Sequence, residues 1–135
     1  MSRMIFPNLP VKDLPKTKEF FAQLGFEFDA RFTDDTAAAM VVSDDAVVML
    51  VTEPMFTGFS GKQLTDTATH AETMLALSAE SRAEVDDVVD KALAAGAQPS
   101  GETMDEGPMY SRGFQDLDGH IWSVIYMDMT VFDEQ

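Results

Sequence analysis

The stretch Met4-Ile-Phe-Pro-Asn-Leu-Pro-Val11 is strand-like and runs into a predicted helix that ends at Leu24-Gly25. A second stretch, Thr73-Met-Leu-Ala-Leu-Ser78, runs into a second predicted helix that ends at Ala95-Gly96. Strand-like segments follow each helix. The chain is therefore predicted to use one strand-helix-strands unit twice, and this duplication decides which side chains share a sheet face.

Both predicted helices have clear start signals. Asp13 is a good N-cap for the first, and Ser81 with Glu84 forms a capping box for the second. Apolar residues then recur at helical spacing, so each helix is expected to lie against a sheet. The predicted buried stripes are Leu14, Thr17, Phe20, Phe21 and Leu24 in the first helix, and Val85, Val88, Val89, Ala92 and Leu93 in the second.

Three short strands are predicted after each helix. They cover residues 27–32, 37–42 and 46–52 in the first half, and 98–104, 109–114 and 121–127 in the second. The predicted fold class is therefore α+β, with two βαβββ modules at 1–53 and 71–135 of a single domain, 1–135. Residues 54–70 are predicted to form a linker or lid, because they are long for a structureless loop. This segment contains Pro54, Met55, Phe56, Gly58, Phe59 and Gly61.

Composition limits the partners and the compartment. The chain has 135 residues, 9 basic and 24 acidic, and its net charge is −15. Such a charge repels nucleic acid and anionic lipid. The chain has no cysteine, which excludes disulfides and thiolate metal sites and suits a reducing cytosol. No run approaches the ~20 apolar residues that span a bilayer. A cytoplasmic protein with neither nucleic-acid nor membrane partners is expected.

Several short motifs, in this order, resemble the vicinal oxygen chelate superfamily, which includes glyoxalase I, bleomycin-resistance proteins and extradiol dioxygenases. The matching residues are Leu9-Pro-Val-Lys-Asp-Leu14, Phe20-Phe21, Leu24-Gly25-Phe26 and Phe114-Gln-Asp-Leu-Asp-Gly-His-Ile-Trp122. The last is close to the family's Asp-Pro-Asp-Gly turn before its final strand. The resemblance covers essentially the whole chain. It implies that the two halves pair their sheets into one cup with the helices outside, and that the protein forms a homodimer.

Metal-dependent members of that superfamily take one ligand from each of four strands, typically His or Glu, with Gln also used. The resemblance places Phe6, Met49, Met74 and Ser123 at these positions. None of these side chains suits a hard or borderline divalent ion, which prefers carboxylate or imidazole. We therefore expect neither the family's usual metal site nor another cofactor.

Period-two alternation predicts which strand residues line the concave wall. The inward set is Met4, Phe6, Asn8, Val47, Met49, Val51, Glu53, Glu72, Met74, Ala76, Ile121, Ser123 and Ile125. The outward set, against the helices, is Ile5, Leu9, Val48, Leu50, Leu75, Leu77, Trp122, Val124 and Tyr126. A mostly apolar wall with a few polar groups at its rim suits a small-molecule ligand, and methionine adapts to varied shapes.

Few polar residues stand out as ligand contacts. Asn8 and Glu53 are candidates at one end of the cup, although Glu53 is equally typical of a strand-end surface carboxylate. Arg112 could orient a ligand carboxylate or simply neutralise nearby acids such as Asp116. His120 is predicted to face away from the cup. The predicted ligand-binding set is Phe6, Asn8, Met49, Glu53, Met74, Arg112 and Ser123.

Three functions from different classes fit these residues. The leading hypothesis is a metal-free member of the superfamily that binds a small organic molecule in an apolar cup. The second is a lyase, isomerase or dioxygenase with a non-standard site, for which Asn8, Glu53 and Glu72 are the suspected groups. The third is a protein-interaction module that uses Met55, Phe56 and Phe59, with self-association as its simplest form. The sequence leaves open whether any reaction is catalysed.

Overall fold

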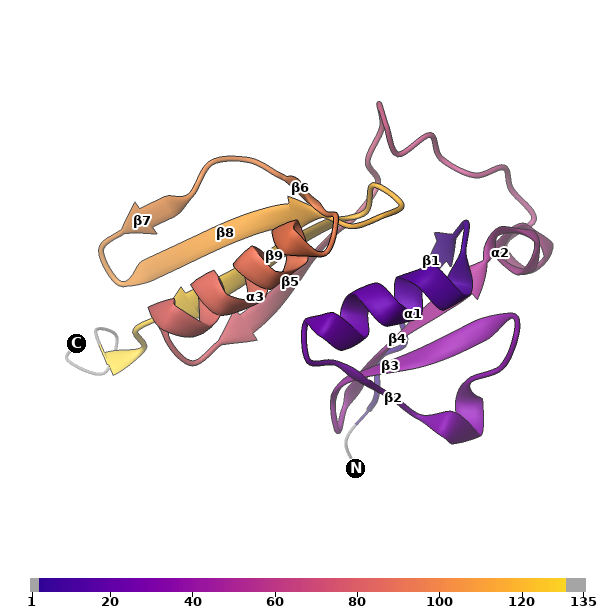
Figure 1. Cartoon of the computed structure of the whole chain (residues 1–135), viewed down its shortest axis with the longest axis horizontal. Helices are drawn as coiled ribbons and strands as arrows, with labels where there is room; N and C mark the ends of the chain where they lie inside the picture. Colours follow the sequence, from indigo (N-terminus) through magenta and orange to yellow (C-terminus); the bar gives the residue numbers. More distant parts are fainter. Residues whose placement is uncertain (1–2, 131–135) are drawn as a thin grey trace. The chain divides into compact units, whose positions relative to one another are not determined.

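The computed structural model describes residues 3–130 of the chain, which divides into two compact units, Met1–Asp66 and Thr67–Gln135. Each unit has one mixed sheet, drawn in indigo to magenta for the first and in red to yellow for the second (Figure 1). Each sheet is built on a β-α-β-β-β plan. The predicted α+β fold with two βαβββ modules is therefore confirmed.

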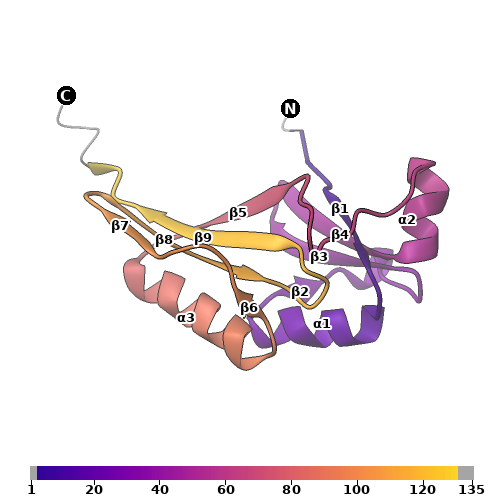
Figure 2. The same cartoon turned by 90° about the horizontal axis from the view of Figure 1, so that it is seen from above.

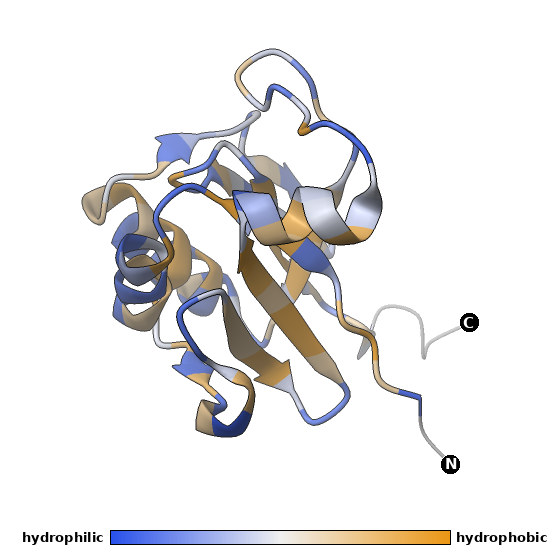
Figure 3. Cartoon of the chain, turned by 90° about the vertical axis from the view of Figure 1, so that its right-hand side faces the viewer, coloured by the Kyte–Doolittle hydropathy of each residue, from blue (hydrophilic) through white to orange (hydrophobic). Residues whose placement is uncertain are grey.

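The first unit contains β1 Asn8–Val11, α1 Leu14–Gln23, β2 Glu27–Phe28, the 3₁₀ helix η1 Ala30–Phe32, β3 Ala37–Ser43, β4 Ala46–Thr52 and α2 Glu53–Ser60. Its sheet has the order β1-β4-β3-β2, with β1 parallel to β4 and the other pairs antiparallel. Figure 2 shows α1 along one face of this sheet. Figure 3 shows that its strands are mostly hydrophobic.

The core of the first unit lies between α1 and the sheet. Asp13 caps α1 as predicted, because its Oδ1 accepts a hydrogen bond of 3.1 Å from the Lys16 N–H. The predicted α1 stripe is buried, and so are three outward strand residues, Leu9, Val48 and Leu50. Ile5 was predicted to be outward as well, but it is 64% exposed. It lies before β1, where a single bridge to Ala46 joins the chain to the sheet margin.

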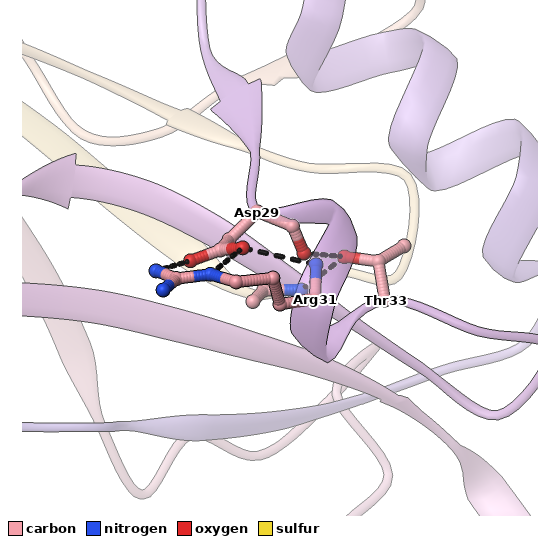
Figure 4. Close-up of polar contacts among 4 residues, drawn as sticks. Asp29, Arg31 and Thr33 are labelled. Carbon is pink, nitrogen blue, oxygen red and sulfur yellow. Dashed lines mark hydrogen bonds and ion pairs between the residues drawn. The ribbon is translucent and has the colours of Figure 1, made fainter.

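The predicted strand at 27–32 is wrong in its second half. β2 ends at Phe28, and Asp29 then caps η1: its Oδ1 accepts from the Arg31 N–H at 3.0 Å, and its Oδ2 accepts from the Arg31 guanidinium at 2.8 Å (Figure 4). The Thr33 hydroxyl donates to the Asp29 carbonyl at 2.8 Å. Short polar side chains that bond the local backbone compete with strand pairing. Asp29 and Thr33 therefore end the strand early.

The predicted linker 54–70 is not a loop throughout, because α2 occupies Glu53–Ser60. Pro54 lies in the first turn of α2, where its missing N–H costs nothing. Gly61 ends the helix at φ +69°, and its N–H donates to the Thr57 carbonyl at 3.0 Å. Proline near the start and glycine after the end are helix signals, although the segment is predicted only as a linker or lid.

The second unit contains β5 Met74–Ala79, α3 Arg82–Ala94, β6 Gln98–Pro99, β7 Met104–Glu106, β8 Met109–Gln115 and β9 Ile121–Met127. The sheet order is β5-β9-β8-β6, and β7 also pairs with β8. The predicted strand at 98–104 is thus split into two short pieces. Gly101, at φ +67°, lies between them in a left-handed conformation that interrupts an extended chain.

Helix α3 packs on one face of the second sheet (Figure 2). Its capping box is present, with the Ser81 hydroxyl accepting from the Glu84 N–H at 3.0 Å. The return bond goes from the Glu80 N–H to the Glu84 carboxylate at 2.9 Å, one residue earlier than predicted. Of the predicted stripe, Val85, Val89 and Ala92 are buried, whereas Val88 and Leu93 are half-buried.

Gly113 in β8 is required by a close backbone approach. A Cβ at this position would lie 2.6 Å from the Ser100 carbonyl oxygen. We expect Gly113→Ala to lower the free energy of unfolding by about 1–3 kcal/mol, because the backbone must move to relieve this overlap. Gly58→Ala in α2 is the matched control, since its Cβ meets nothing within 4 Å. The control should be neutral or slightly stabilising in urea unfolding, and equal losses in both variants would contradict this account.

Candidate ligand-binding face

The strand register of the second unit sorts its side chains onto two faces. On the helix-covered face, Trp122 lies opposite Phe114, and Val124 lies opposite Arg112. Trp122, Phe114 and Val124 are buried there. The other face, called here the open face, is made by Met74, Ala76, Ser78, Met104, Glu106, Met109, Ser111, Gly113, Gln115, Ile121, Ser123, Ile125 and Met127. Met74 on this face is strongly exposed, at 73%, and Met104 and Met127 are also exposed.

Residues paired across neighbouring strands form rows on the open face, and the rows differ in the size of their side chains. Ala76, Ser123 and Gly113 form one row across three strands and have the smallest side chains. Larger rows flank it on both sides, one centred on Ile121 and the other on Ile125. The side chains are therefore smallest in this middle row, called here the low row, and the Ser100 carbonyl oxygen lies close to Gly113 at one end of it.

A hollow of about 420 Å³ lies at the edge strand β5 and the end of β9, and its lining residues Ala76, Ser78, Ile125 and Met127 belong to the open face. Its lining residues are Ala76, Leu77, Ser78, Ala79, Ile125, Met127 and Met129. Its volume falls in the range of small-molecule sites, and its walls are almost entirely apolar. Ser78 provides the one side-chain hydroxyl among these residues. The hollow is suited to shape-based binding of an apolar group rather than to proton transfer.

Two of the predicted ligand-binding residues lie on the open face, Met74 and Ser123. Met74 is at one end of β5, and Ser123 is in the low row. The inward set predicted from alternation includes Ala76 and Ile125 of the hollow, whereas the predicted ligand-binding set contains none of its lining residues. The alternation in residues 121–127 already indicated Ile125 as an inward residue.

The predicted residues of the first unit lie in or next to its own sheet. Asn8 lies opposite Met49 in the parallel pair of β1 and β4, and its side-chain amide donates to the Phe6 carbonyl at 2.8 Å. Phe6 is 51% exposed. Glu53 was predicted as a strand-end residue, but it is the first residue of α2.

Arg112 lies away from the open face, on the side covered by α3. Its guanidinium donates to Asp86 at 3.0 Å and to Asp90 at 2.9 Å, and both carboxylates belong to α3. The Tyr110 hydroxyl also donates to Asp86, at 2.6 Å. The acids that Arg112 neutralises are thus Asp86 and Asp90 rather than Asp116. A ligand-orienting role for Arg112 stays a prediction, and Arg112 does not lie on the open face.

This network makes part of the stability depend on pH. The Tyr110 hydroxyl and the Arg112 guanidinium lower the pKa of Asp86 below its usual value. The folded protein therefore gains stability above the ordinary Asp pKa, near 4, and loses it as pH falls through the lowered pKa. As the pH falls from 5 to 2.5, we expect the urea midpoint of Asp86→Asn to fall less than that of the wild type. The midpoint of Tyr110→Phe should fall by an intermediate amount. Parallel profiles for wild type and both variants would contradict this.

The decisive comparison is with protein-family models. A model described as the Glyoxalase/Bleomycin resistance protein/Dioxygenase superfamily matches residues 4–124. The chain belongs to this superfamily. No curated protein matches it significantly.

Solved structures of several other proteins have the same fold. A hypothetical protein from S. aureus is 27% identical, with 93% of this chain and 94% of that chain covered and a TM-score of 0.79. The fosfomycin resistance protein FosX from Listeria monocytogenes, solved with Mn(II) and sulfate, is 16% identical, with 98% of both chains covered and a TM-score of 0.68. The antibiotic-binding protein TnmS3 from Streptomyces sp. CB03234 is 18% identical, with 94% and 97% covered and a TM-score of 0.63.

The superfamily's divalent metal does not fit the side chains at the expected ligand positions. These positions carry the Phe6 ring, the Met49 and Met74 thioethers and the Ser123 hydroxyl. A hard or borderline divalent ion prefers carboxylate and imidazole donors. Within residues 3–130, no group of three or more His, Cys, Asp or Glu side chains is placed to hold a metal ion.

The superfamily turn, Asp116-Leu-Asp-Gly119, has a structural role here. Asp116 is buried, and its Oδ2 accepts from the Trp122 indole N–H at 2.9 Å. Its Oδ1 accepts from the backbone N–H groups of Asp118 and His120 at 2.9 and 3.0 Å. Burial raises the pKa of Asp116. The turn thus ties the start of β9 to the core.

No helix in the described range, 3–130, is long and apolar enough to cross a membrane.

Proposed function

We propose that this superfamily member binds a small apolar organic molecule on the open face of its second unit, without a divalent metal, in a reducing cytosol. One observation carries the proposal: a hollow of about 420 Å³, lined almost entirely by apolar residues, lies where the open face meets the edge strand β5. Burying such a surface under an apolar ligand is favourable by about 25 cal/mol per Å² of apolar area.

The chemistry of the open face supports binding rather than catalysis. Its one ionisable side chain is Glu106, and the remaining members are apolar or neutral. Methionines surround the hollow and present flexible thioethers that adapt to different shapes. General acid-base catalysis needs a titratable group within hydrogen-bond reach of the reacting atoms. The described walls of the hollow contain none, since Ser78 is their most polar residue.

The structural neighbours are compatible with this role. TnmS3 is described as an antibiotic-binding protein, and FosX as a fosfomycin resistance protein. Sequestration of a toxic or signalling small molecule by this chain would be a related use of the fold. The proposal for this chain rests on its own hollow.

Binding is tested by titrating the protein with Nile red, a neutral apolar dye, and following the ¹³C-methyl signals of its methionines. We expect saturable binding that shifts Met127 and Met129, whose side chains line the hollow. Met40, fully buried in the first unit, is the internal control and should not shift. A failure of any apolar probe to move the Met127 and Met129 signals would contradict the proposal. Signals are assigned with single Met→Leu variants.

We also propose that the protein forms a homodimer through α2. Phe59 of α2 is 83% exposed, and the same helix carries the half-buried Met55 and Phe56. A group of apolar side chains at the surface is the kind of patch that marks an interaction site. Phe59→Asp should convert a dimer to a monomer in sedimentation velocity, with the circular dichroism spectrum unchanged. A monomeric wild type, or a dimer that survives this substitution, would contradict the proposal.

A further inference from the structure

The second unit carries a large excess of negative charge. Residues 67–135 contain three basic and 14 acidic side chains, so they account for a net charge of 3 − 14 = −11 out of the total of −15. The potential around a protein follows this summed charge, particularly over apolar, poorly screened surfaces. A ligand on the open face therefore lies in a negative potential.

The basic side chains of this unit are already paired. Arg112 lies between Asp86 and Asp90, and Lys91 pairs with Asp87 at 2.9 Å. Arg82 donates to Asp105 at 2.6 Å and stacks over the Tyr110 ring at 5.1 Å. All three arginine and lysine side chains belong to α3 or to the helix-covered face. Among the described residues of this unit, no arginine or lysine side chain lies on the open face to balance a ligand anion.

Glu106 is the charged residue of the open face, and the strand register fixes its position. Its neighbour Asp105 turns to the helix-covered side, where it meets Arg82, so Glu106 points to the opposite side. It lies opposite Met109, which in turn lies opposite Met127 at the hollow. At about 4.8 Å per strand, Glu106 is about 10 Å from Met127, close enough to act on a charge in the hollow.

These observations point to one class of ligand for the proposed site. We infer that the open-face hollow selects apolar organic cations and rejects apolar anions. An anion would lose its hydration against apolar side chains and gain no basic partner. A cation whose charge is spread over apolar groups loses little hydration, meets polarisable thioethers and gains from the surrounding acids. This inference rests on the proposed function, because it names the ligand class of the same hollow.

Two probes of nearly the same size and shape test the sign of the charge. Tetraphenylphosphonium and tetraphenylborate each carry four phenyl groups and differ in charge. At 10 mM salt, we expect the cation to bind at least ~10-fold more tightly than the anion in calorimetry, a preference that 0.5 M salt should reduce. The cation should shift the Met127 and Met129 methyl signals. Anion binding that is as tight or tighter would overturn the inference, and so would cation binding that leaves those signals unchanged.

A pair of variants tests the role of Glu106. Glu106→Gln should weaken binding of the cation about 3-fold at low salt and leave binding of Nile red unchanged. Glu19→Gln is the matched control, since it removes the same charge from an exposed position on α1. Equal effects of the two variants would show that the preference comes from net charge alone and would overturn the role of the hollow. If Nile red and the anion bind at the hollow and the cation does not, the proposed function stands and this inference fails. If no probe binds there, both fail.

Discussion

Asp116→Ala is expected to lower the free energy of unfolding by about 3 kcal/mol, although the residue lies in a turn. The carboxylate accepts hydrogen bonds from the Trp122 indole and from the backbone of Asp118 and His120. Alanine accepts none of them, and a buried donor without a partner costs about 1–3 kcal/mol. Urea unfolding followed by circular dichroism measures the change. Asp44→Ala, in the exposed β3–β4 turn, is the control and should change stability by less than about 0.5 kcal/mol.

A double-mutant cycle separates the indole bond from the rest of this effect. Trp122→Phe keeps an aromatic ring against Phe114, whose ring is stacked with that of Trp122 at 6.4 Å between centroids, but removes the N–H donor. We expect a coupling energy of about 1–2 kcal/mol between Asp116→Ala and Trp122→Phe. Strict additivity would mean that the indole bond contributes nothing and that the turn is held by its backbone bonds alone.

Ser78→Trp is expected to raise the Kd for Nile red at least ~10-fold, a loss of about 1.4 kcal/mol in binding free energy. Ser78 is exposed on β5 and lines the hollow, so an indole at this position occupies the space that the ligand needs. Tryptophan is well tolerated in strands, and the fold should be retained. Dye titration measures binding, and thermal unfolding of the same sample checks the fold.

Ala22→Trp is the matched control for the Ser78→Trp variant. Ala22 is exposed on α1, so the variant adds the same aromatic group at a position that belongs to another unit. Its Kd for Nile red should equal that of the wild type. Unchanged dye binding by Ser78→Trp, with the fold intact, would place the ligand outside the hollow.

Local chemistry made the helices predictable. Asp13 and Ser81 accept backbone hydrogen bonds at the first turns of α1 and α3, and Gly25 and Gly96 follow these helices with φ of +102° and +114°. Such signals act over four residues and need no tertiary context. The same kind of signal, Pro54 and Gly61, marks α2 within the segment that was predicted only as a linker or lid.

The candidate site was harder to predict, because a sheet face depends on register between strands. The alternation of side chains along β9 correctly placed Trp122 and Ser123 on opposite faces of the sheet. Arg112 could be assigned to a face only through its pairing with Val124 in the next strand. Sequence alone does not supply that pairing. The low row of Ala76, Ser123 and Gly113 likewise comes from three strands, and no single segment shows it.

The chain has a single tryptophan, and its position makes it a selective optical reporter. Trp122 is fully buried beneath α3, on the side of the sheet opposite the hollow. Its emission should redden when the second unit unfolds and the indole meets water. A ligand resting on the far side of β9 touches neither the ring nor its carboxylate partner, so occupancy should leave the spectrum unaltered while shifting the melting temperature.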